Sequence, residues 1–348
     1  MRLSPAGARA VDGIPAIRLA WQRAGNVDTA MRWHPLLPLS LCLISAASLT
    51  AVDEGDTFVE PAEAGPDFLV QGEYIGEKSA AQVIALGGGK FHIVGWSHGL
   101  PGVAFDAERK IELDAQREGD RIVFDAEGWK GQIDGGTLSG TNADGKSVTL
   151  QKTERTSPTL GAKPPADALV LFDGTNASDW AGGKMDARGF LQCGTKSKRA
   201  FRDCTLHIEF RTPFRPGARG QGRGNSGVYV QDRYEVQVLD SFGLAGEDNE
   251  CGGIYKTAKP LVNMCLPPLS WQTYDIDFEA ARFDNDGRKT RPALMTVRHN
   301  GVPIHDHVEI PKVTPGAGRG DGPEPGPIQL QNHGNPVFFR NIWIVPKD

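Results

Sequence analysis

Four stretches of the chain alternate apolar residues with residues that can accept, donate or transfer a proton. Successive side chains of a β-strand point to opposite faces of its sheet, so this alternation predicts strands with one apolar face and one face equipped for chemistry. In residues 234–240 the positions on the polar face are Glu235 and Gln237. Across all four stretches these positions are His207, Glu209, Arg211, Glu235, Gln237, Asp275, Asp277, Glu279, Gln329, Gln331 and His333.

Carboxylates, carboxamides and imidazoles beside aromatic rings are suited to a sugar, which needs paired hydrogen bonds and a flat apolar platform. Tyr229, Tyr255 and Trp271 lie close in sequence to these alternating strands. We expect the acidic run at 275–279 to be an ordinary solvated face. The other three stretches predict a carbohydrate site.

The spacing of Glu235, Gln237 and Asp240 resembles the Glu-x-Asp-x-x-Glu pattern of jelly-roll endoglucanases. In those enzymes the three positions supply a nucleophile, a helper and an acid/base residue. This chain keeps the offsets but has an amide in the helper position and a shorter carboxylate at the end. A retaining glycosidase needs two carboxyl groups about 5–5.5 Å apart, so the altered triplet argues against ordinary double-displacement hydrolysis.

The composition is typical of an all-β protein. The 348 residues include 43 Gly and 24 Pro, which favour short strands joined by turns over long helices. A formal net charge of −5 lacks the basic excess that nucleic-acid binding requires, so we expect no nucleic-acid partner. Roughly ten expected strands after residue 166 predict a two-sheet sandwich or jelly roll.

The start of the chain contains a pattern typical of an export signal. Arg32 precedes an apolar run at 36–49 that is too short to span a bilayer, and small residues follow. We expect Met31 to be the true start; the alternative is a genuine long leader. The chain is therefore expected to be periplasmic or extracellular, with no membrane span in its mature form. The expected parts are a spurious extension at 1–30, a signal peptide at 31–51, a flexible lead at 52–66, a small β accessory domain at 67–153, a linker at 154–165 and a jelly-roll domain at 166–348.

Four cysteines remain after the expected signal: Cys193, Cys204, Cys251 and Cys265. An even number of cysteines in an exported chain favours disulfides. The simplest pairing is Cys193–Cys204 and Cys251–Cys265. Buried free thiols are the alternative. A zinc site is less favoured because the spacings lack a zinc knuckle.

A combination of short motifs after residue 166 is more specific than any one of them alone. They are Leu171-Phe172-Asp173-Gly174 with Trp180, the segments 222–229, 234–240, 251–255 and 271–275, and Gln331-Asn332-His333-Gly334-Asn335-Pro336 followed by 339–343. Over residues 166–346 this combination resembles the 3-keto-disaccharide hydrolase domain family. The resemblance implies a concanavalin-like jelly roll, export, and cleavage of glycosides already oxidised to a ketone at sugar C3.

The implied chemistry suits the candidate residues. A ketone at C3 acidifies the C2 proton, so one base and a few hydrogen-bond donors suffice for elimination of the aglycone, after which water adds to the enone. We expect Glu235 to be the base, or an acid that aids departure, and Gln237 to be a donor. His333 and Glu209 are further candidates for proton transfer. The expected substrate contacts are Asn225, Tyr229, Tyr255, Lys256, Trp271, Gln331 and Arg211.

Two other functions and a metal stay open at this stage. A lectin-like module would bind glycans without turnover, and a conventional endoglucanase would hydrolyse unoxidised chains. Jelly-roll sugar proteins often hold calcium through Asp side chains, so a divalent cation is possible at Asp173, Asp240, Asp275 or the 284–287 turn. The turn residues at 284–287 are better explained as a hairpin loop.

Overall fold

The computed structural model describes residues 55–103 and 110–347. The expected extension at 1–30 and signal peptide at 31–51 lie outside the described residues. Within the described part of the chain, no helix is long and apolar enough to cross a membrane.

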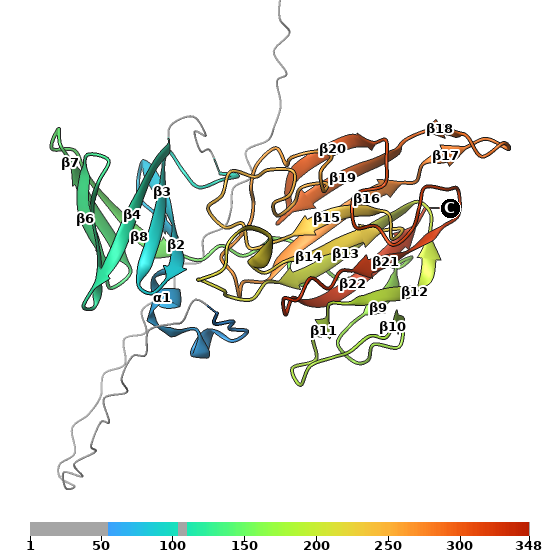
Figure 1. The fold of residues 1–348 in the computed structure, drawn as a ribbon, viewed down its shortest axis with the longest axis horizontal. Coiled ribbons are helices and arrows are strands. Elements are labelled where there is room, and N and C mark those ends of the chain that lie inside the picture. The colour runs from blue at the N-terminus through green and yellow to red at the C-terminus, as the bar shows by residue number, and fades with distance from the viewer. Residues whose placement is uncertain (1–54, 104–109, 348) are drawn as a thin grey trace, which may run out of the picture. The chain divides into compact units, whose positions relative to one another are not determined.

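The first domain is a closed barrel of eight antiparallel strands in sequence order (Figure 1). Its elements are η1 (Pro61–Glu63), α1 (Gly65–Val70), β1 (Gly72–Ile75), β2 (Ser79–Gly87), β3 (Lys90–Ser97), β4 (Lys110–Glu118), β5 (Arg121–Ala126), β6 (Trp129–Asp134), β7 (Thr137–Asn142) and β8 (Ser147–Thr153). Strand β1 pairs with both β2 and β8, which closes the barrel. The expected small β domain is therefore confirmed.

A short helix precedes the first strand of the barrel. Residues 65–70 form helix α1, and the strand begins only at Gly72. Pro66 fits the first turn of a helix, where its missing N–H is not needed. The buried Asp67 carboxylate accepts hydrogen bonds from the Gly89 N–H and from Arg117, which fixes the helix against the barrel.

The lead expected to be flexible at 52–66 has defined contacts where it is described. Phe58 forms an isolated β-bridge with Phe214, and the Val59 carbonyl accepts hydrogen bonds from Arg188 and Arg211. Glu60 also pairs with both guanidinium groups. The lead thus crosses onto the second domain.

The second domain is a sandwich of two antiparallel sheets, the concanavalin-like jelly roll that the sequence predicts (Figure 1). The five-stranded sheet has the order β10 (Trp180–Ala181), β12 (Thr195–Phe201), β21 (Gly326–Leu330), β14 (Ser226–Val230) and β15 (Tyr234–Val238). The seven-stranded sheet has β11 (Leu191–Gln192), β22 (Phe338–Pro346), β13 (Cys204–Arg211), β16 (Gln272–Glu279), β19 (Ala293–His299) and β20 (Val302–Ile310), with β9 (Leu169–Phe172) on β22. The remaining elements are η2 (Gly220–Gly222) and the hairpin of β17 (Arg282–Phe283) and β18 (Lys289–Arg291).

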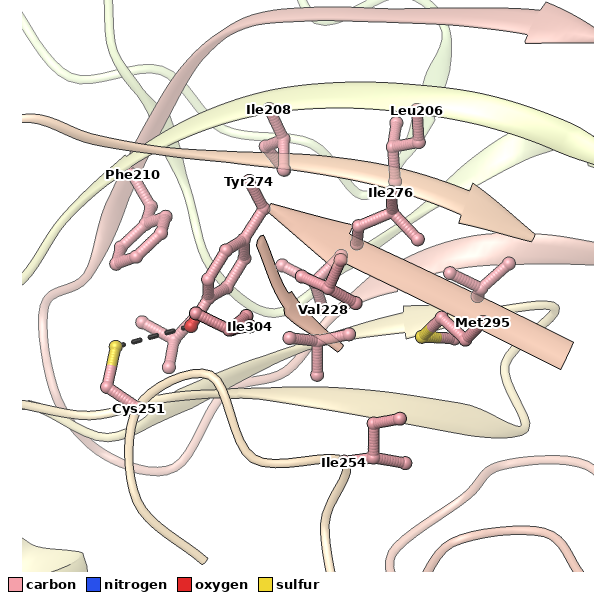
Figure 2. Close-up of a cluster of buried hydrophobic side chains, with 14 of the residues drawn as sticks. Leu206, Ile208, Phe210, Val228, Cys251, Ile254, Tyr274, Ile276, Met295 and Ile304 are labelled. Carbon is pink, nitrogen blue, oxygen red and sulfur yellow. Dashed lines mark hydrogen bonds between the residues drawn. The ribbon is translucent and has the colours of Figure 1, made fainter. Parts of the chain in front are cut away.

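The apolar positions of the alternating strands meet between the two sheets. Figure 2 shows Leu206, Ile208 and Phe210 of β13 in this core, together with Val228 of β14 and Ile276 of β16. Burying each such side chain contributes about 1.5–3 kcal/mol, so the alternation fixes which face of each strand turns inward. The polar positions of β13 and β15 must then lie on the two outer faces of the sandwich.

The expected disulfides are wrong for the described chain, in which all four cysteines remain thiols. The Cys193 thiol points to the Asn335 carbonyl, whereas Cys204 is buried in the core. Cys251 Sγ lies 3.2 Å from the Tyr274 hydroxyl (Figure 2), and the Cys265 thiol points to the carbonyls of Leu239 and Leu266.

Candidate active site

One continuous row of side chains crosses the outer face of the five-stranded sheet. Cross-strand pairing places Ala181 beside Lys196, Lys196 beside Gln329, Gln329 beside Tyr229, and Tyr229 beside Glu235. Each of the five strands therefore contributes one residue. Directly paired side chains of neighbouring strands are close enough to interact, so the four polar members of the row, from Lys196 to Glu235, form one contiguous polar surface.

Glu235 is the most strongly perturbed carboxyl group of this surface. It is 2% exposed, and burial raises its pKa to about 8, although a hydrogen bond from Tyr229 partly opposes the shift. The carboxyl group lies over Gly227 of the neighbouring strand, where an added Cβ would be 2.0 Å from Glu235 Oε1. A side chain at position 227 would occupy the space of the carboxyl group.

The Pro315 carbonyl competes with Glu235 for the proton of the Tyr229 hydroxyl, so Tyr229 stabilises the ionised carboxylate of Glu235 only partly. This hydroxyl lies 2.7 Å from Glu235 Oε2 and 3.0 Å from the Pro315 carbonyl, and it accepts a hydrogen bond from Gln331 Nε2 at 3.3 Å. One hydroxyl proton cannot satisfy two acceptors. If Glu235 carries a proton and donates it to Tyr229, then Tyr229 can donate to Pro315 and every group is satisfied. At neutral pH Glu235 is therefore suited to be an acid.

A second row lies beside the first and consists of Gln331, Gly227 and Gln237. The Gln331 N–H donates to the Gly227 carbonyl, and Gly227 pairs with Gln237 across the strands. Gln237 Nε2 donates to Gln221 Oε1 at 3.0 Å. Gln221 was not among the sequence candidates, because a glutamine in a glycine-rich loop carries no periodic signal.

Asn225 lies beside this second row, because it and Gln237 both bond the Gln221 side chain. We call Asn225, Gly227, Gln237 and Gln331 the floor of the site. The Asn225 amide nitrogen donates to the carbonyl and the side chain of Gln221. The side chain is 1% exposed, yet Oδ1 has no hydrogen-bond partner among the described residues. Buried polar atoms are normally paired, so an unpaired oxygen beside other polar groups is typical of a position that meets a ligand hydroxyl.

Three further candidates lie on segments that follow β15 and β21. The Tyr255 N–H donates to the Glu235 carbonyl at 3.1 Å, which adds its segment to the edge of β15. Lys256 follows it and pairs with Asp248 at 3.2 Å. His333 is exposed in the loop after β21, and its carbonyl accepts a hydrogen bond from Asn335.

The loop of residues 311–325 covers part of the site. The Glu235 N–H donates to the Thr314 hydroxyl, which itself donates to the Arg233 carbonyl. A Cβ added to Gly316 would lie 2.7 Å from the Tyr229 hydroxyl. Tyr229 is 0% exposed beneath this loop, so it positions Glu235 and cannot act as the aromatic platform for a sugar that the sequence suggested.

The structure does not bring Glu209 to Glu235. Glu209 and Arg211 lie on β13, whose outer face belongs to the seven-stranded sheet, on the opposite side of the sandwich. Trp271 lies there too, with the Arg211 guanidinium 5.4 Å and the Arg340 guanidinium 4.1 Å from its ring centroid. The grouping of these residues with Glu235 is therefore corrected.

Glu209 has a network of structural partners. It accepts hydrogen bonds from the Gly161 N–H, Asn341 and Arg340. Burial would raise its pKa, but hydrogen bonds from His207 and from these three groups lower the pKa to about 2. The linker at 154–165 thus packs on this face through Gly161. Glu209 is ionised at neutral pH and holds the linker, Asn341 and Arg340 in place.

The aspartates considered for a cation have other partners. Asp240 pairs with Arg223 at 2.7 Å, Asp173 accepts from Thr175, and Asp275 lies 2.6 Å from His207. Asp284 accepts the N–H groups of its own hairpin turn, as expected for a turn residue. Among the described residues, no group of three or more His, Cys, Asp or Glu side chains is arranged to hold a metal ion.

The second domain is similar to a known family and to several solved structures. Residues 167–345 match the family model of the 3-keto-alpha-glucoside-1,2-lyase-like domain. Three solved structures of predicted glycosyl hydrolases from Parabacteroides distasonis ATCC 8503 are also similar to this chain. The first is 36% identical with a TM-score of 0.48, and the match covers 52% of this chain and 84% of that one. The other two are 16% and 21% identical, each with a TM-score of 0.36; they cover 52% and 51% of this chain and 94% and 98% of their own. No curated protein matches the chain.

The jelly-roll fold and the family match together define a protein of a carbohydrate-acting family. More particularly, the chain belongs to the 3-keto-alpha-glucoside-1,2-lyase-like domain family, whose model spans more than half of it. The resemblance found in the sequence motifs is confirmed.

Proposed function

We propose that this protein cleaves glycosides whose sugar carries a ketone at C3, by elimination of the aglycone followed by addition of water. The observation that carries the proposal is the buried carboxyl group of Glu235, whose pKa of about 8 keeps it protonated at neutral pH. A retaining hydrolase requires an ionised carboxylate nucleophile close to a second carboxyl group. Here the neighbours of Glu235 are Tyr229, Gln237 and Gly227, and Asp240 is paired with Arg223.

In the first step a base removes the C2 proton, and the C2–H electrons form an enolate with the C3 ketone. The exposed imidazole of His333 is the group we assign to accept this proton. The Gln237 and Gln331 amides, each with one N–H left to donate, are suited to stabilise the enolate oxygen, and Asn225 Oδ1 is suited to accept a hydrogen bond from a substrate hydroxyl. The C1–oxygen bond then breaks as the enolate electrons form the C1–C2 double bond, and the leaving oxygen takes the Glu235 proton.

In the second step water adds to the enone. The water oxygen bonds to C1 while its proton passes to the Glu235 carboxylate, and C2 receives a proton from the imidazolium of His333. The product is the free 3-keto sugar, and both side chains return to their starting protonation states. The net reaction is hydrolysis without a covalent sugar–enzyme intermediate.

We also propose that the protein acts outside the cytoplasm, because residues 31–51 have the charge and apolar length of an export signal. Fractionation of the native host with an antibody tests this proposal. Detection in the cytoplasm alone, with residues 31–51 still attached, would contradict it.

Steady-state assays with a matched glucoside and 3-keto-glucoside test the function. We expect turnover of the ketone only, and loss of about 10²–10⁴-fold in kcat for Glu235→Gln. Equal turnover of the unoxidised glucoside would indicate a conventional glycosidase. Binding of both sugars without turnover of either would indicate a lectin.

A further inference from the structure

The first domain holds a cavity at one of the two ends of its barrel. We propose that this cavity binds a small uncharged molecule with one apolar ring and a hydroxyl group at one end, as in an alkylphenol. The cavity is formed by strands β2 to β8 (Figure 1) and lies outside residues 167–345, so it takes no part in the reaction proposed above.

One end of the barrel is filled and covered. Helix α1 lies at this end, and its Phe68 packs against Phe214 with the ring centroids 5.3 Å apart. Tyr74 and Phe91 fill the interior in the same apolar cluster, and both are 0% exposed. A ligand therefore cannot enter from the helix side.

At the other end, inward-facing apolar side chains stay partly exposed. Ile111 is 38% exposed, and Trp129 and Val148 are half-buried. Cross-strand pairing places Ile111 beside Gly95 and Val148 beside Gly140, so these positions share the inner face of the barrel. The hollow between them can be reached from outside the barrel.

The volume and the walls of the cavity suit one ring. The cavity measures about 110 Å³, comparable to the apolar cavity of about 150 Å³ that holds one benzene molecule. Phe124 and Trp129 supply aromatic walls, against which the ring of a ligand can pack edge to face. The aliphatic part of the wall includes Ile93, Leu113, Leu138 and Leu150.

The hollow exists because one inward position carries no side chain. Gly95 pairs with Ala81 and Ile111, and a Cβ added to it would lie 3.9 Å from the nearest non-neighbouring atom. Gly131, by contrast, is covered by the ring of Phe124, which an added Cβ would meet at 2.5 Å. Protein interiors are otherwise close-packed, so the empty position at Gly95 leaves room for a ligand.

The polar lining residues favour a ligand with one polar end. Ser79 and Ser97 pair with each other where β2 begins and β3 ends, and Lys146 lies in the turn before β8. These three groups at the rim can bond a single hydroxyl group while the ring lies inside. A sugar would press several hydroxyl groups against apolar walls, where they lose their hydrogen bonds to water. An anion would lose hydration on entry, and the exposed ammonium group of Lys146 would compensate this loss only weakly.

Calorimetric titration of the full chain with 4-methylphenol tests the site. We expect saturable binding with a Kd of about 10 μM to 1 mM, a range within reach of a ligand of this size. Benzoate and methyl glucoside should bind at least about tenfold more weakly. Two variants should weaken the binding of 4-methylphenol about tenfold or more: Gly95→Val, which fills the hollow, and Ile111→Trp, which narrows its mouth.

The matched control is Gly55→Val, because Gly55 lies in the lead and an added Cβ there meets no atom within 4 Å. This variant should bind 4-methylphenol with the affinity of the wild type. If Gly95→Val fails to fold, Ile111→Trp decides, because its side chain lies at a partly exposed position. Three results would each overturn the proposal: no saturable binding by the wild type, equal binding by the wild type and the folded cavity variants, or tighter binding of benzoate than of 4-methylphenol.

Discussion

The Tyr229 hydroxyl lies between Glu235 Oε2, at 2.7 Å, and the Pro315 carbonyl, at 3.0 Å. This arrangement relates the protonation of the candidate acid to the loop above it. When Glu235 loses its proton, Tyr229 must donate to the carboxylate, and the Pro315 carbonyl loses its donor. The Pro315 carbonyl therefore keeps its hydrogen bond from Tyr229 only while Glu235 is protonated.

The pH profile of wild-type kcat/KM should fall as the pH rises through about 8, because the acid needs its proton. The hydrogen bond from Tyr229 lowers the pKa of Glu235, so Tyr229→Phe should move this alkaline limb to higher pH and reduce kcat at pH 7. Rate measurements from pH 5 to 10 on both proteins check this. If the alkaline fall in rate occurs at the same pH in Tyr229→Phe and in the wild type, then ionisation of Glu235 does not cause that fall.

Glu235 should also make the protein less stable at alkaline pH. Its folded-state pKa of about 8 lies above the ordinary 4.5, so the folded protein binds more protons than the unfolded chain between these values. Stability is then lost as the pH rises from 4.5 to 8, with a slope approaching about 1.4 kcal/mol per pH unit. Denaturant unfolding should show Glu235→Gln gaining stability relative to the wild type over this window. A pH-independent difference would contradict the raised pKa.

Gly227→Ala should abolish activity, because the new methyl group would lie 2.0 Å from the present position of Glu235 Oε1 and would displace the carboxyl group. The overpacking should cost about 1–3 kcal/mol of stability. The matched control is Gly222→Ala, where an added Cβ meets no atom within 4 Å. A Gly227→Ala protein with normal kcat would show that the carboxyl position is not critical.

Glu209→Gln should affect stability and leave catalysis unchanged. Its pKa of about 2 means that its contribution is present above pH 4.5 and is lost as the pH falls towards 2. We expect a cost of about 2 kcal/mol at pH 7, below the value for a fully buried pair because Arg340 is 33% exposed. Thermal melts and kcat at 25 °C check this. A large drop in kcat without loss of stability would show that Glu209 takes part in catalysis.

The sequence predicted the faces of the strands but could not predict which sheet each strand joins. Alternation correctly turned Leu206 and Val236 inward and Glu209 and Glu235 outward. A sandwich has two outer faces, however, and both give the same period of two. The strand order that separates Glu209 from Glu235 depends on long-range pairing, which local pattern does not encode.

The parts of the site that the sequence did not predict lack a periodic signal. Strand β12 reads Thr-Lys-Ser-Lys-Arg-Ala-Phe, without the apolar alternation that marks a half-buried strand, so Lys196 was not a candidate. Gln221 lies in the short helix η2, and Tyr229 was expected to be a sugar platform, whereas its hydroxyl bonds Glu235. Spatial convergence alone identifies these residues.

Cleavage of a 3-keto-glucoside in D₂O, with the isotope at C2 followed by NMR, tests the central claim most directly. Elimination and hydration through an enolate predict a product that carries solvent deuterium at C2, and a primary isotope effect when C2 of the substrate is deuterated. A product that retains its original C2 hydrogen, with no isotope effect, would contradict the account and indicate direct displacement at C1.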